Sequence, residues 1–224
     1  MRRFLFLPMP QLSIPITCDA TFEAEAQDCG ARLIAGIDEV GRGALAGPVV
    51  AAAVILDLNC IPKGLNDSKK LTAARREKLD AEIRKAALAF AIARVEAEEI
   101  DRINILLATH KAMRQAIQSL NPTPDYLLLD AVSLKELAIP QKAIIKGDAK
   151  SVSIAAASII AKVARDQWMA DYDQEFPGYR FVSNAGYGTA EHLQALREIG
   201  PSKIHRLTFR KVLPEAEQSR LFQT

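Results

Sequence analysis

Two adjacent acids, Asp38 and Glu39, interrupt an apolar stretch that extends over residues 34–50. Apolar segments lie on both sides of the pair, so folding should draw the two carboxylates toward a core. Neighbouring carboxylates in such a setting repel each other unless a cation accompanies them. The stretch therefore predicts a metal site. A glycine-arginine-glycine sequence at 41–43 follows directly, and its open backbone N–H groups suit a phosphate or a sugar.

Two further acids follow short apolar runs later in the chain. Asp130 follows the run 126–129, and Asp148 follows the run 143–146 and one glycine. Ligand crevices of open α/β sheets lie at the carboxyl ends of the strands, so neighbouring parallel strands would bring all four carboxylates together. Oxygen ligands suit Mg²⁺ or Mn²⁺, and two such ions would serve phosphodiester hydrolysis. A single acid at a strand end, by contrast, more often forms a turn or caps a helix.

The apolar pattern predicts the strands and helices that would position these acids. Strands are expected over residues 33–37, 49–56, 89–95, 126–129 and 143–146. Helices are expected after Thr72 and over residues 98–104, 105–120, 151–169 and 189–199, with a last one from about residue 214. This order predicts an α/β fold in which a mixed five-stranded sheet is flanked by helices on both faces. Helices bridge the later strands, which should therefore run parallel to the first.

The helix over residues 105–120 is expected to bury one stripe of side chains at helical spacing. The stripe consists of Leu106, His110, Met113, Ile117 and Leu120. Ser158 and Trp168 are likewise expected to serve packing. His205, which lies in a basic loop with Arg206, is assigned equally to substrate contact and to packing.

The composition is that of a globular protein, with 224 residues of which 49% are hydrophobic and 25% charged. A formal net charge of +2 is too small to indicate nucleic-acid binding by itself. Three cysteines form no Cys-x-x-Cys pair and are expected to be reduced thiols of a cytoplasmic protein. No apolar run approaches the roughly 18 residues of a membrane span. The N-terminus carries two arginines, but Pro8, Pro10 and Pro15 argue against a targeting peptide.

Six motifs, in this order, resemble the bacterial ribonuclease HII family, the type 2 ribonucleases H. They are GIDEVGRG, LNDSKKL, YLLLD, KGD followed by SIAAASIIAKVARD, GYGT and HRLTF, spread over about residues 33–210. The resemblance implies an RNase H-like fold with a small C-terminal helical region. It implies three parts: an N-terminal extension over residues 1–30, a catalytic core over 31–180, and a helical substrate-binding region over 181–224.

The resemblance also implies an activity. The enzyme would hydrolyse the RNA strand of RNA/DNA hybrids and cut 5′ of single ribonucleotides in duplex DNA, leaving 3′-hydroxyl and 5′-phosphate ends. It would use two Mg²⁺ or Mn²⁺ ions. The residues that match the family's metal-binding catalytic acids are Asp38, Glu39, Asp130 and Asp148.

Substrate contacts are expected at a second set of residues. In the family, the glycine-arginine-glycine loop reads the ribose 2′-hydroxyl, the group that distinguishes RNA from DNA, and a tyrosine senses the RNA–DNA junction. The matching residues here are Gly41, Arg42, Gly43 and Tyr187. Phosphate contacts, which would make binding salt-dependent, are expected at Ser68, Lys69, Lys70 and Lys146. The alternative for these polar residues is an ordinary solvated surface.

Two positions depart from the family pattern. Asn184 and Ala185 stand where the family often has histidine and lysine, so one cation is missing near Tyr187. Thr208 replaces the usual serine of the HR-x-S-F motif and keeps the hydroxyl.

The C-terminal tail resembles the short Gln-x-x-Leu-Phe peptide with which bacterial replication proteins bind the sliding clamp. The matching residues are Gln218, Leu221 and Phe222, and an ordinary helix end could produce the same pattern. The other expected partners are RNA/DNA hybrids and duplex DNA with embedded ribonucleotides. The protein is expected to act as a monomer and without a membrane.

Three alternatives remain. A non-catalytic hybrid-binding protein on the same fold would be favoured by loss of an acid, but all four are present. Ribonuclease HIII usually carries a substantial N-terminal substrate-binding domain, which about 30 residues cannot form. A transposase-like nuclease would lack the glycine-arginine-glycine loop. Two matters stay open: whether primer removal or single-ribonucleotide repair is the main role, and whether residues 1–30 add an edge strand or have no fixed structure.

Overall fold

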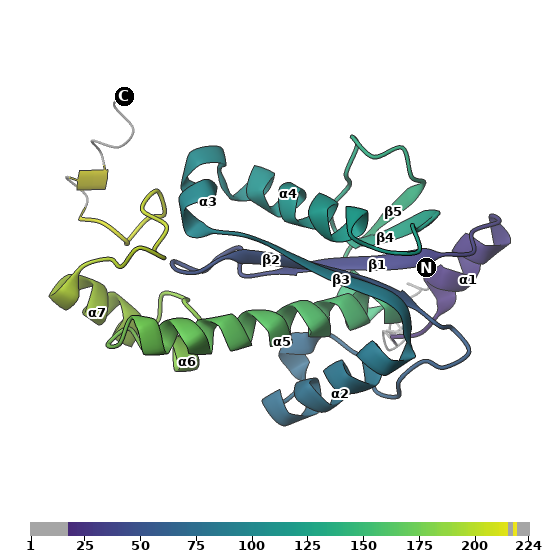
Figure 1. Cartoon of the computed structure of the whole chain (residues 1–224), viewed down its shortest axis with the longest axis horizontal. Coiled ribbons are helices and arrows are strands. Elements are labelled where there is room, and N and C mark those ends of the chain that lie inside the picture. The colour runs from purple at the N-terminus through teal and green to yellow at the C-terminus, as the bar shows by residue number, and fades with distance from the viewer. Residues whose placement is uncertain (1–17, 215–216, 219–224) are drawn as a thin grey trace, which may run out of the picture.

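A mixed five-stranded sheet forms the centre of the computed structural model, which describes residues 18–214 and 217–218 (Figure 1). The strand order is β3-β2-β1-β4-β5. The strands are β1 (Ile34–Val40), β2 (Val49–Leu56), β3 (Ala87–Val95), β4 (Tyr126–Asp130) and β5 (Gln141–Ile144). Strand β1 pairs antiparallel with β2 and parallel with β4, and β4 pairs parallel with β5. The expected α/β fold with a mixed sheet is confirmed, and β1, β4 and β5 run in the same direction.

Helices cover both faces of this sheet. They are α1 (Thr21–Asp28), α2 (Ala73–Ala86), α3 (Ala97–Ile103), α4 (Ile105–Gln118), α5 (Val152–Glu175), α6 (Phe181–Asn184) and α7 (Ala190–Ile199). Two short 3-10 turns, η1 (Ser68–Lys70) and η2 (Gly147–Ala149), lie in the connections. Helix α4 covers one face, and α2 and α5 cover the other (Figure 1).

The alternation of side chains along the strands divides the core into two layers. Ile37 and Leu129 pack toward Met113 of α4, whereas Val54 packs on the opposite face with residues of α2 and α5. Helix α5 lies very close to β1, because a Cβ added at Gly36 would stand 2.1 Å from the backbone carbon of Ser153. Small residues in both elements therefore seat α5 directly beneath the strand that carries Asp38 and Glu39.

Strand β5 differs from its expected bounds. The expected strand over residues 143–146 is wrong by two residues, because pairing with β4 ends at Ile144. Ile145 is 74% exposed, and Lys146 leaves the strand in a left-handed conformation with φ +57°. The apolar run 143–145 suggested burial, but the length of β4 decides where the ladder stops.

The expected stripe of α4 is also wrong at its first turn. Leu106 is 49% exposed and His110 is only half-buried, whereas Met113, Ile117 and Leu120 are buried as expected. The residues that complete the buried face of the helix are Ala108, Thr109, Ala112 and Ala116. Small side chains let α4 approach the sheet closely, so the helix turns its alanines inward and its first two leucines outward.

The described part of the N-terminal segment forms α1 and not an edge strand. Ala26 of α1 packs with Leu128 and Ile154. Glu23 is buried, and its Oε1 accepts hydrogen bonds from Ser151 Oγ at 2.6 Å and from the Ser153 N–H at 2.9 Å. Helix α1 is thereby attached to the start of α5. The proline-containing start that argued against a targeting peptide falls in residues 1–17, outside the described residues.

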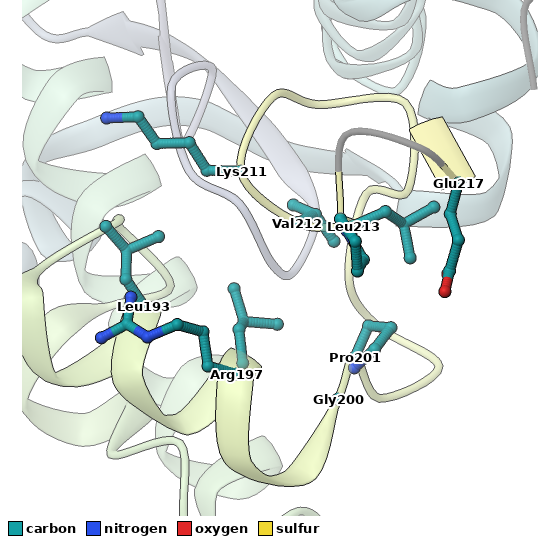
Figure 2. A pocket seen from close by; sticks show the side chains of 10 residues that line it. Leu193, Arg197, Gly200, Pro201, Lys211, Val212, Leu213 and Glu217 are labelled. Atoms are coloured by element: carbon teal, nitrogen blue, oxygen red, sulfur yellow. The ribbon is translucent and has the colours of Figure 1, made fainter. Parts of the chain in front are cut away.

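The C-terminal segment packs against the far end of α5. Phe181, Leu196 and Ile204 form a cluster with Met169 of α5. A pocket of about 690 Å³ lies between α7 and the segment that follows, with Leu193 and Arg197 on one side and residues 212–213 on the other (Figure 2). None of the predicted site residues lines it. The expected last helix falls mostly in the tail beyond the described residues, and the three-part division stays a prediction.

None of the helices in the described residues combines the length and the apolar character that crossing a membrane requires.

Candidate active site

The four predicted acids lie at the ends of the three parallel strands. Asp38 and Glu39 belong to β1, Asp130 is the last residue of β4, and Asp148 lies in η2, just before α5. Ile37 pairs with Leu129 across the two strands, which places Asp38 beside Asp130. Side chains alternate along a strand, so these two carboxylates share the face covered by α5.

Backbone N–H groups fix two of the carboxylates. Asp130 Oδ1 accepts a hydrogen bond from the N–H of Gly147 at 2.7 Å, and Asp38 Oδ1 accepts one from the N–H of Glu39 at 2.8 Å. A Cβ at Gly147 would stand 2.6 Å from Ile154 Cδ1 of α5. The glycine therefore lets the turn that carries Asp148 close between Asp130 and the helix.

The electrostatics of the cluster favour an added cation. Burial raises the pKa of Asp38 well above its usual range, and the charges of Glu39 and Asp130 raise it further. Burial also raises the pKa of Glu39, although Arg42, whose Nη1 lies 3.2 Å from Glu39 Oε1, opposes this effect. The pKa of Asp148 is raised by burial and then by the charges of Asp67 and Asp130. Ionised together, these acids repel one another in a partly dry site.

A divalent cation with a preference for oxygen fits this donor set. Glu39 Oε2 is buried without a hydrogen-bond partner among the described residues, so one acceptor in the cluster remains unsatisfied. All the side-chain atoms that could bind a metal here are carboxylate oxygens, the ligands of Mg²⁺ and Mn²⁺. Within residues 18–214 and 217–218, no three acid, histidine or cysteine side chains are already gathered as a closed cage. Binding of an ion would have to draw the carboxylates closer.

Two residues that sequence reasoning did not assign to the site contact the acids. Asp67 lies beside Asp148 and raises the pKa of that carboxyl, and its Oδ1 accepts a hydrogen bond from the N–H of Lys69 at 2.9 Å. Ser158 was expected only to pack. It is buried, but it also hydrogen-bonds Asp38, and its Oγ lies 2.9 Å from Ser68 Oγ, within hydrogen-bond distance. A hydroxyl on the alanine-rich face of a buried helix is the sequence signal that could have identified this role.

The expected phosphate-binding residues differ in how close they lie to the acids. Ser68 is buried beside Ser158. Partial burial lowers the pKa of Lys69, but the charges of Asp38 and Asp148 outweigh it, so the pKa is raised overall. Lys70 and Lys146 are exposed, and within the described residues neither has an ion pair. Ser68 is thus joined to the acids through Ser158, and Lys69 interacts with Asp38 and Asp148 by charge.

Two buried arginines, Arg165 and Arg206, support the glycine-arginine-glycine loop. Gly41 has φ +89°, and a Cβ there would stand 2.2 Å from Arg165 Nε. Arg206 donates from Nε and Nη2 to the carbonyl of Gly47 at 3.0 and 2.8 Å, and from Nη1 to the carbonyl of Arg42 at 2.9 Å.

Arg165 completes this support from α5. It donates to the carbonyls of Pro48, Ala46 and Ala185 at 3.0, 3.1 and 2.8 Å. Both guanidinium groups were missed as site residues. For Arg165 the signal was its position four residues from the buried Met169, on the apolar face of α5.

Tyr187 lies against this loop although it is far away in sequence. The N–H groups of Leu45 and Ala46 donate to the carbonyl of Gly186 at 2.8 and 3.3 Å. A Cβ at Gly43 would stand 3.9 Å from the ring of Tyr187, which is 37% exposed. The loop and the tyrosine therefore form one continuous surface next to Glu39.

Asn184 and Ala185, which depart from the family pattern, build the turn that carries Tyr187. We call residues 184–189 the tyrosine turn. Asn184 is buried, its Nδ2 donates to the carbonyl of Tyr179, and its Oδ1 accepts from the N–H of Gly186, both at 2.7 Å. Ala185 has φ +48° and offers its carbonyl to Arg165. Asn184 thus acts within the fold, where the expected cation would have faced a phosphate.

Three other side chains make their contacts within the fold. Thr208 Oγ1 donates to Asp101 Oδ1 at 2.5 Å. His205 is buried, which favours packing over substrate contact. The ring of Trp168 lies 4.5 Å from the guanidinium carbon of Arg94 and packs at the edge of the core beneath β2.

Comparison with known proteins identifies relatives over most of the chain. Residues 35–212 match the family model of ribonuclease HII. Ribonuclease HII of Geobacter sulfurreducens is 55% identical over 199 residues, covering 89% of this chain and 92% of that protein. Ribonuclease HII of Enterococcus faecalis is 57% identical over 188 residues, covering 84% of this chain and 73% of that protein.

Solved structures show the same architecture. Ribonuclease H2 of Pyrococcus horikoshii OT3 superposes with a TM-score of 0.69 at 26% identity, covering 86% of this chain and all 100% of that one. The ribonuclease HII solved in a PCNA complex from Archaeoglobus fulgidus gives a TM-score of 0.67 at 26% identity, covering 81% and 95%. Bst-RNase HIII in complex with Mn²⁺ shares the fold, with a TM-score of 0.61 at 18% identity, covering 85% and 70%.

The expected RNase H-like fold is therefore confirmed. The family model spans the acids, the loop and the tyrosine turn, and the bacterial relatives agree with it over most of their length. The chain belongs to the ribonuclease HII family and is a ribonuclease H.

Proposed function

We propose that this ribonuclease H cuts the RNA strand of RNA/DNA hybrids, and also cuts 5′ of single ribonucleotides embedded in duplex DNA, leaving 3′-hydroxyl and 5′-phosphate ends. The observation that carries the proposal is the short link between the two functional parts. Arg42 of the loop is ion-paired with Glu39 of the acid cluster at 3.2 Å. A ribose held at the loop would thus place its neighbouring phosphate beside the carboxylates.

Asp38, Glu39, Asp130 and Asp148 would hold two divalent ions, Mg²⁺ or Mn²⁺. When bound, such ions supply an activated water and stabilise the leaving oxygen. The unsatisfied Glu39 Oε2 and the raised pKa values of Asp38, Glu39 and Asp148 support this assignment. A related fold has been solved in complex with Mn²⁺.

The chain's own groups would orient these ligands. Ser158 hydrogen-bonds Asp38 and stabilises its ionised form, and the N–H of Gly147 holds Asp130. Lys69 lies next to Asp38 and Asp148, where its ammonium group would attract the scissile phosphate. Ser68, Lys70 and Lys146 would add contacts to flanking phosphates.

Discrimination of RNA would come from the loop and the tyrosine. The absence of a side chain at Gly41 and at Gly43 leaves the backbone open to close approach by a ribose, and the 2′-hydroxyl can both donate and accept there. Tyr187 stands beside Gly43 and would contact the sugar on the DNA side of the junction. Because both elements are fixed by buried bonds, they would meet the substrate with little rearrangement.

Cleavage of a labelled duplex that contains one ribonucleotide tests the proposal. The expected result is a single cut on its 5′ side with Mg²⁺ or with Mn²⁺, no cut in an all-DNA duplex, and a 3′-hydroxyl that a polymerase can extend. Asp130→Asn is the matched control and should bind the duplex without cutting it. Cleavage of long hybrids alone would overturn the single-ribonucleotide part, and unimpaired cleavage by Asp130→Asn would overturn the site assignment.

We propose a sliding clamp as a second partner, bound through Gln218, Leu221 and Phe222. A structural neighbour solved as a complex with PCNA supports this. Leu221 and Phe222 lie outside the described residues. Gln218 donates from Nε2 to the carbonyls of Thr208 and Phe209 at 3.3 and 2.7 Å, so clamp binding would have to replace these two bonds.

Titrating a C-terminal peptide of residues 214–224 and the whole enzyme against the clamp tests this partner. The peptide should bind more tightly than the whole chain, because its Gln218 has no internal partner to lose. Absence of binding by either at high micromolar concentration would exclude it.

A further inference from the structure

Two buried histidines lie next to each other behind the tyrosine turn, outside the acid cluster. His192 belongs to the first turn of α7, and His205 lies in the loop that follows this helix. Both are buried, and their Nε2 atoms are 2.9 Å apart. Each ring uses its other nitrogen as well. His192 Nδ1 is 2.9 Å from the carbonyl oxygen of Tyr187, and His205 Nδ1 is 2.9 Å from the backbone nitrogen of Ser202.

The hydrogen bonds that connect Ser202, the two histidines and Tyr187 form a series. The direction of the first bond sets the direction of the others. A backbone N–H can only donate, so Nδ1 of His205 must accept from Ser202 and carries no proton. The proton of neutral His205 therefore lies on Nε2 and is donated to Nε2 of His192. His192 must then carry its proton on Nδ1, which donates it to the carbonyl of Tyr187.

The surroundings of the pair keep both rings neutral. The rings of Tyr179 and Phe181 lie 4.8 to 6.2 Å from the two imidazole centroids. Burial lowers the pKa of His192, and burial together with His192 lowers the pKa of His205 to about 4. Every other assignment of protons to two neutral rings would set two donors or two lone pairs against each other. The geometry thus admits one arrangement.

This series of hydrogen bonds ends at the carbonyl of Tyr187, in the tyrosine turn. The carbonyl of Tyr187 receives a second hydrogen bond from the N–H of Thr189 at 2.8 Å, and the N–H of Tyr187 donates to the carbonyl of Asn184 at 2.9 Å. With both lone pairs of its carbonyl used and its N–H bonded, the backbone at Tyr187 has a fixed orientation. The direction in which its ring leaves the turn is fixed with it.

We propose that His192 and His205 form a directed hydrogen-bond relay that sets the orientation of Tyr187, and that His192 is a positioning residue for recognition of the embedded ribonucleotide. The proposal rests on the proposed role of Tyr187. It assigns no proton transfer to either ring. The relay differs from ordinary core packing because its effect depends on which ring nitrogen carries the proton.

Histidine ¹⁵N NMR on the full chain at pH 7 tests the relay without any activity. The expected spectrum shows His192 protonated on Nδ1 and His205 protonated on Nε2. The chain has 3 histidines, so His110 serves as the internal reference. The opposite tautomer in either ring, or a charged imidazole, would overturn the relay even if the enzyme cuts as proposed.

A pair of matched variants tests the positioning role. In His192→Asn the amide nitrogen stands near the place of Nδ1 and can still donate to Tyr187, whereas in His192→Gln it stands near the place of Nε2 and cannot. We expect His192→Asn to keep the ratio of kcat/KM between the embedded ribonucleotide and a long hybrid. We expect His192→Gln to lower that ratio about tenfold, which corresponds to the free energy of one hydrogen bond.

Ser202→Ala is the control, because it removes the hydroxyl but keeps the N–H that sets the direction of the relay. It should leave the ratio unchanged. Equal losses in the asparagine and glutamine variants, or equal losses on both substrates, would reduce His192 to a packing residue. If the glutamine variant fails to fold, the tautomers of the native enzyme still decide. Failure of the native enzyme to cut the embedded ribonucleotide would refute the proposed function and leave the tautomer result standing.

Discussion

The acid cluster and the tyrosine turn adjoin each other in one site, but their polar groups are satisfied in different ways. Among the acids, burial and mutual repulsion raise the pKa of Asp38, Glu39 and Asp148, and one carboxylate oxygen lacks a hydrogen-bond partner in the described structure. Around the turn, two buried arginines and two neutral histidines find partners within the chain.

The acid cluster and the tyrosine turn are therefore preorganised for function in different ways. The acids carry an electrostatic cost that a bound cation would relieve, so their arrangement is complete only with a ligand. The turn is complete by itself and presents a fixed backbone. Removing a charge should therefore stabilise the metal-free protein in the first region, whereas removing a hydrogen-bonding group should destabilise it in the second.

The largest effect is expected from Asp38→Asn. Cleavage should fall about a thousandfold, because one ligand of the proposed ions is lost. In EDTA the variant should be more stable than the native protein at pH 8. The folded-state pKa of Asp38 is raised, so its contribution to stability is most favourable at low pH and is lost as the pH rises above about 4 through that raised value.

Urea unfolding in EDTA at pH 5 and pH 8 measures this difference. Asp28→Asn, which removes an exposed acid of α1, should leave both the activity and the pH dependence unchanged. If Asp38→Asn kept the native pH dependence of stability, the acid cluster would not be under electrostatic strain.

Arg206→Lys should have the next largest effect, and in the opposite direction on stability. Lysine lacks the planar fork that serves Gly47 and Arg42, so buried carbonyls would lose their donors. The free energy of unfolding should fall by about 3 kcal/mol. Chemical denaturation checks this, with the exposed Arg210→Lys as the control. A loss below about 0.5 kcal/mol, the usual scale of a surface change, would contradict the comparison.

Ser158→Ala probes the contact between helix α5 and the acids. The hydroxyl stabilises ionised Asp38, so its removal should raise the pKa of Asp38 further and reduce kcat/KM about tenfold at pH 7. Ser153→Ala in the same helix is a close control, since Ser153 Oγ is buried without a hydrogen-bond partner among the described residues. Equal effects of the two alanines would mean that the hydroxyl of Ser158 contributes only by packing.

The smallest effect is expected from Lys146→Ala. If Lys146 contacts one phosphate, the slope of log binding constant against log salt should decrease by about 0.9. Filter binding or fluorescence anisotropy at several salt concentrations would measure the slope. Lys85→Ala, on the exposed side of α2, provides the comparison. An unchanged slope would assign Lys146 to the solvated surface.

Much of the fold and of the site could be predicted from sequence, for local reasons. Apolar runs marked β2 and β4 closely, because their side chains are buried on both faces, whereas β1 continued to Val40, three residues past its expected end, and included Asp38 and Glu39. A single acid after such a run more often forms a turn or caps a helix, so the acids stood out because three runs each carried one or two at their ends. The bounds of β5 and the first turn of α4 were wrong, because the length of a neighbouring strand and the closeness of the sheet decided them.

By itself, the sequence determined the α/β class, the positions of the acids and the glycine-arginine-glycine loop, and through its motifs the family. Only the tertiary structure decided which polar groups meet. Ser158 reached Asp38, Arg206 reached Gly47, and His192 reached Tyr187 across long separations or between different elements. The physical reason is that a local pattern reports whether a side chain will be buried, whereas the partner of a buried polar group is set by how distant segments pack.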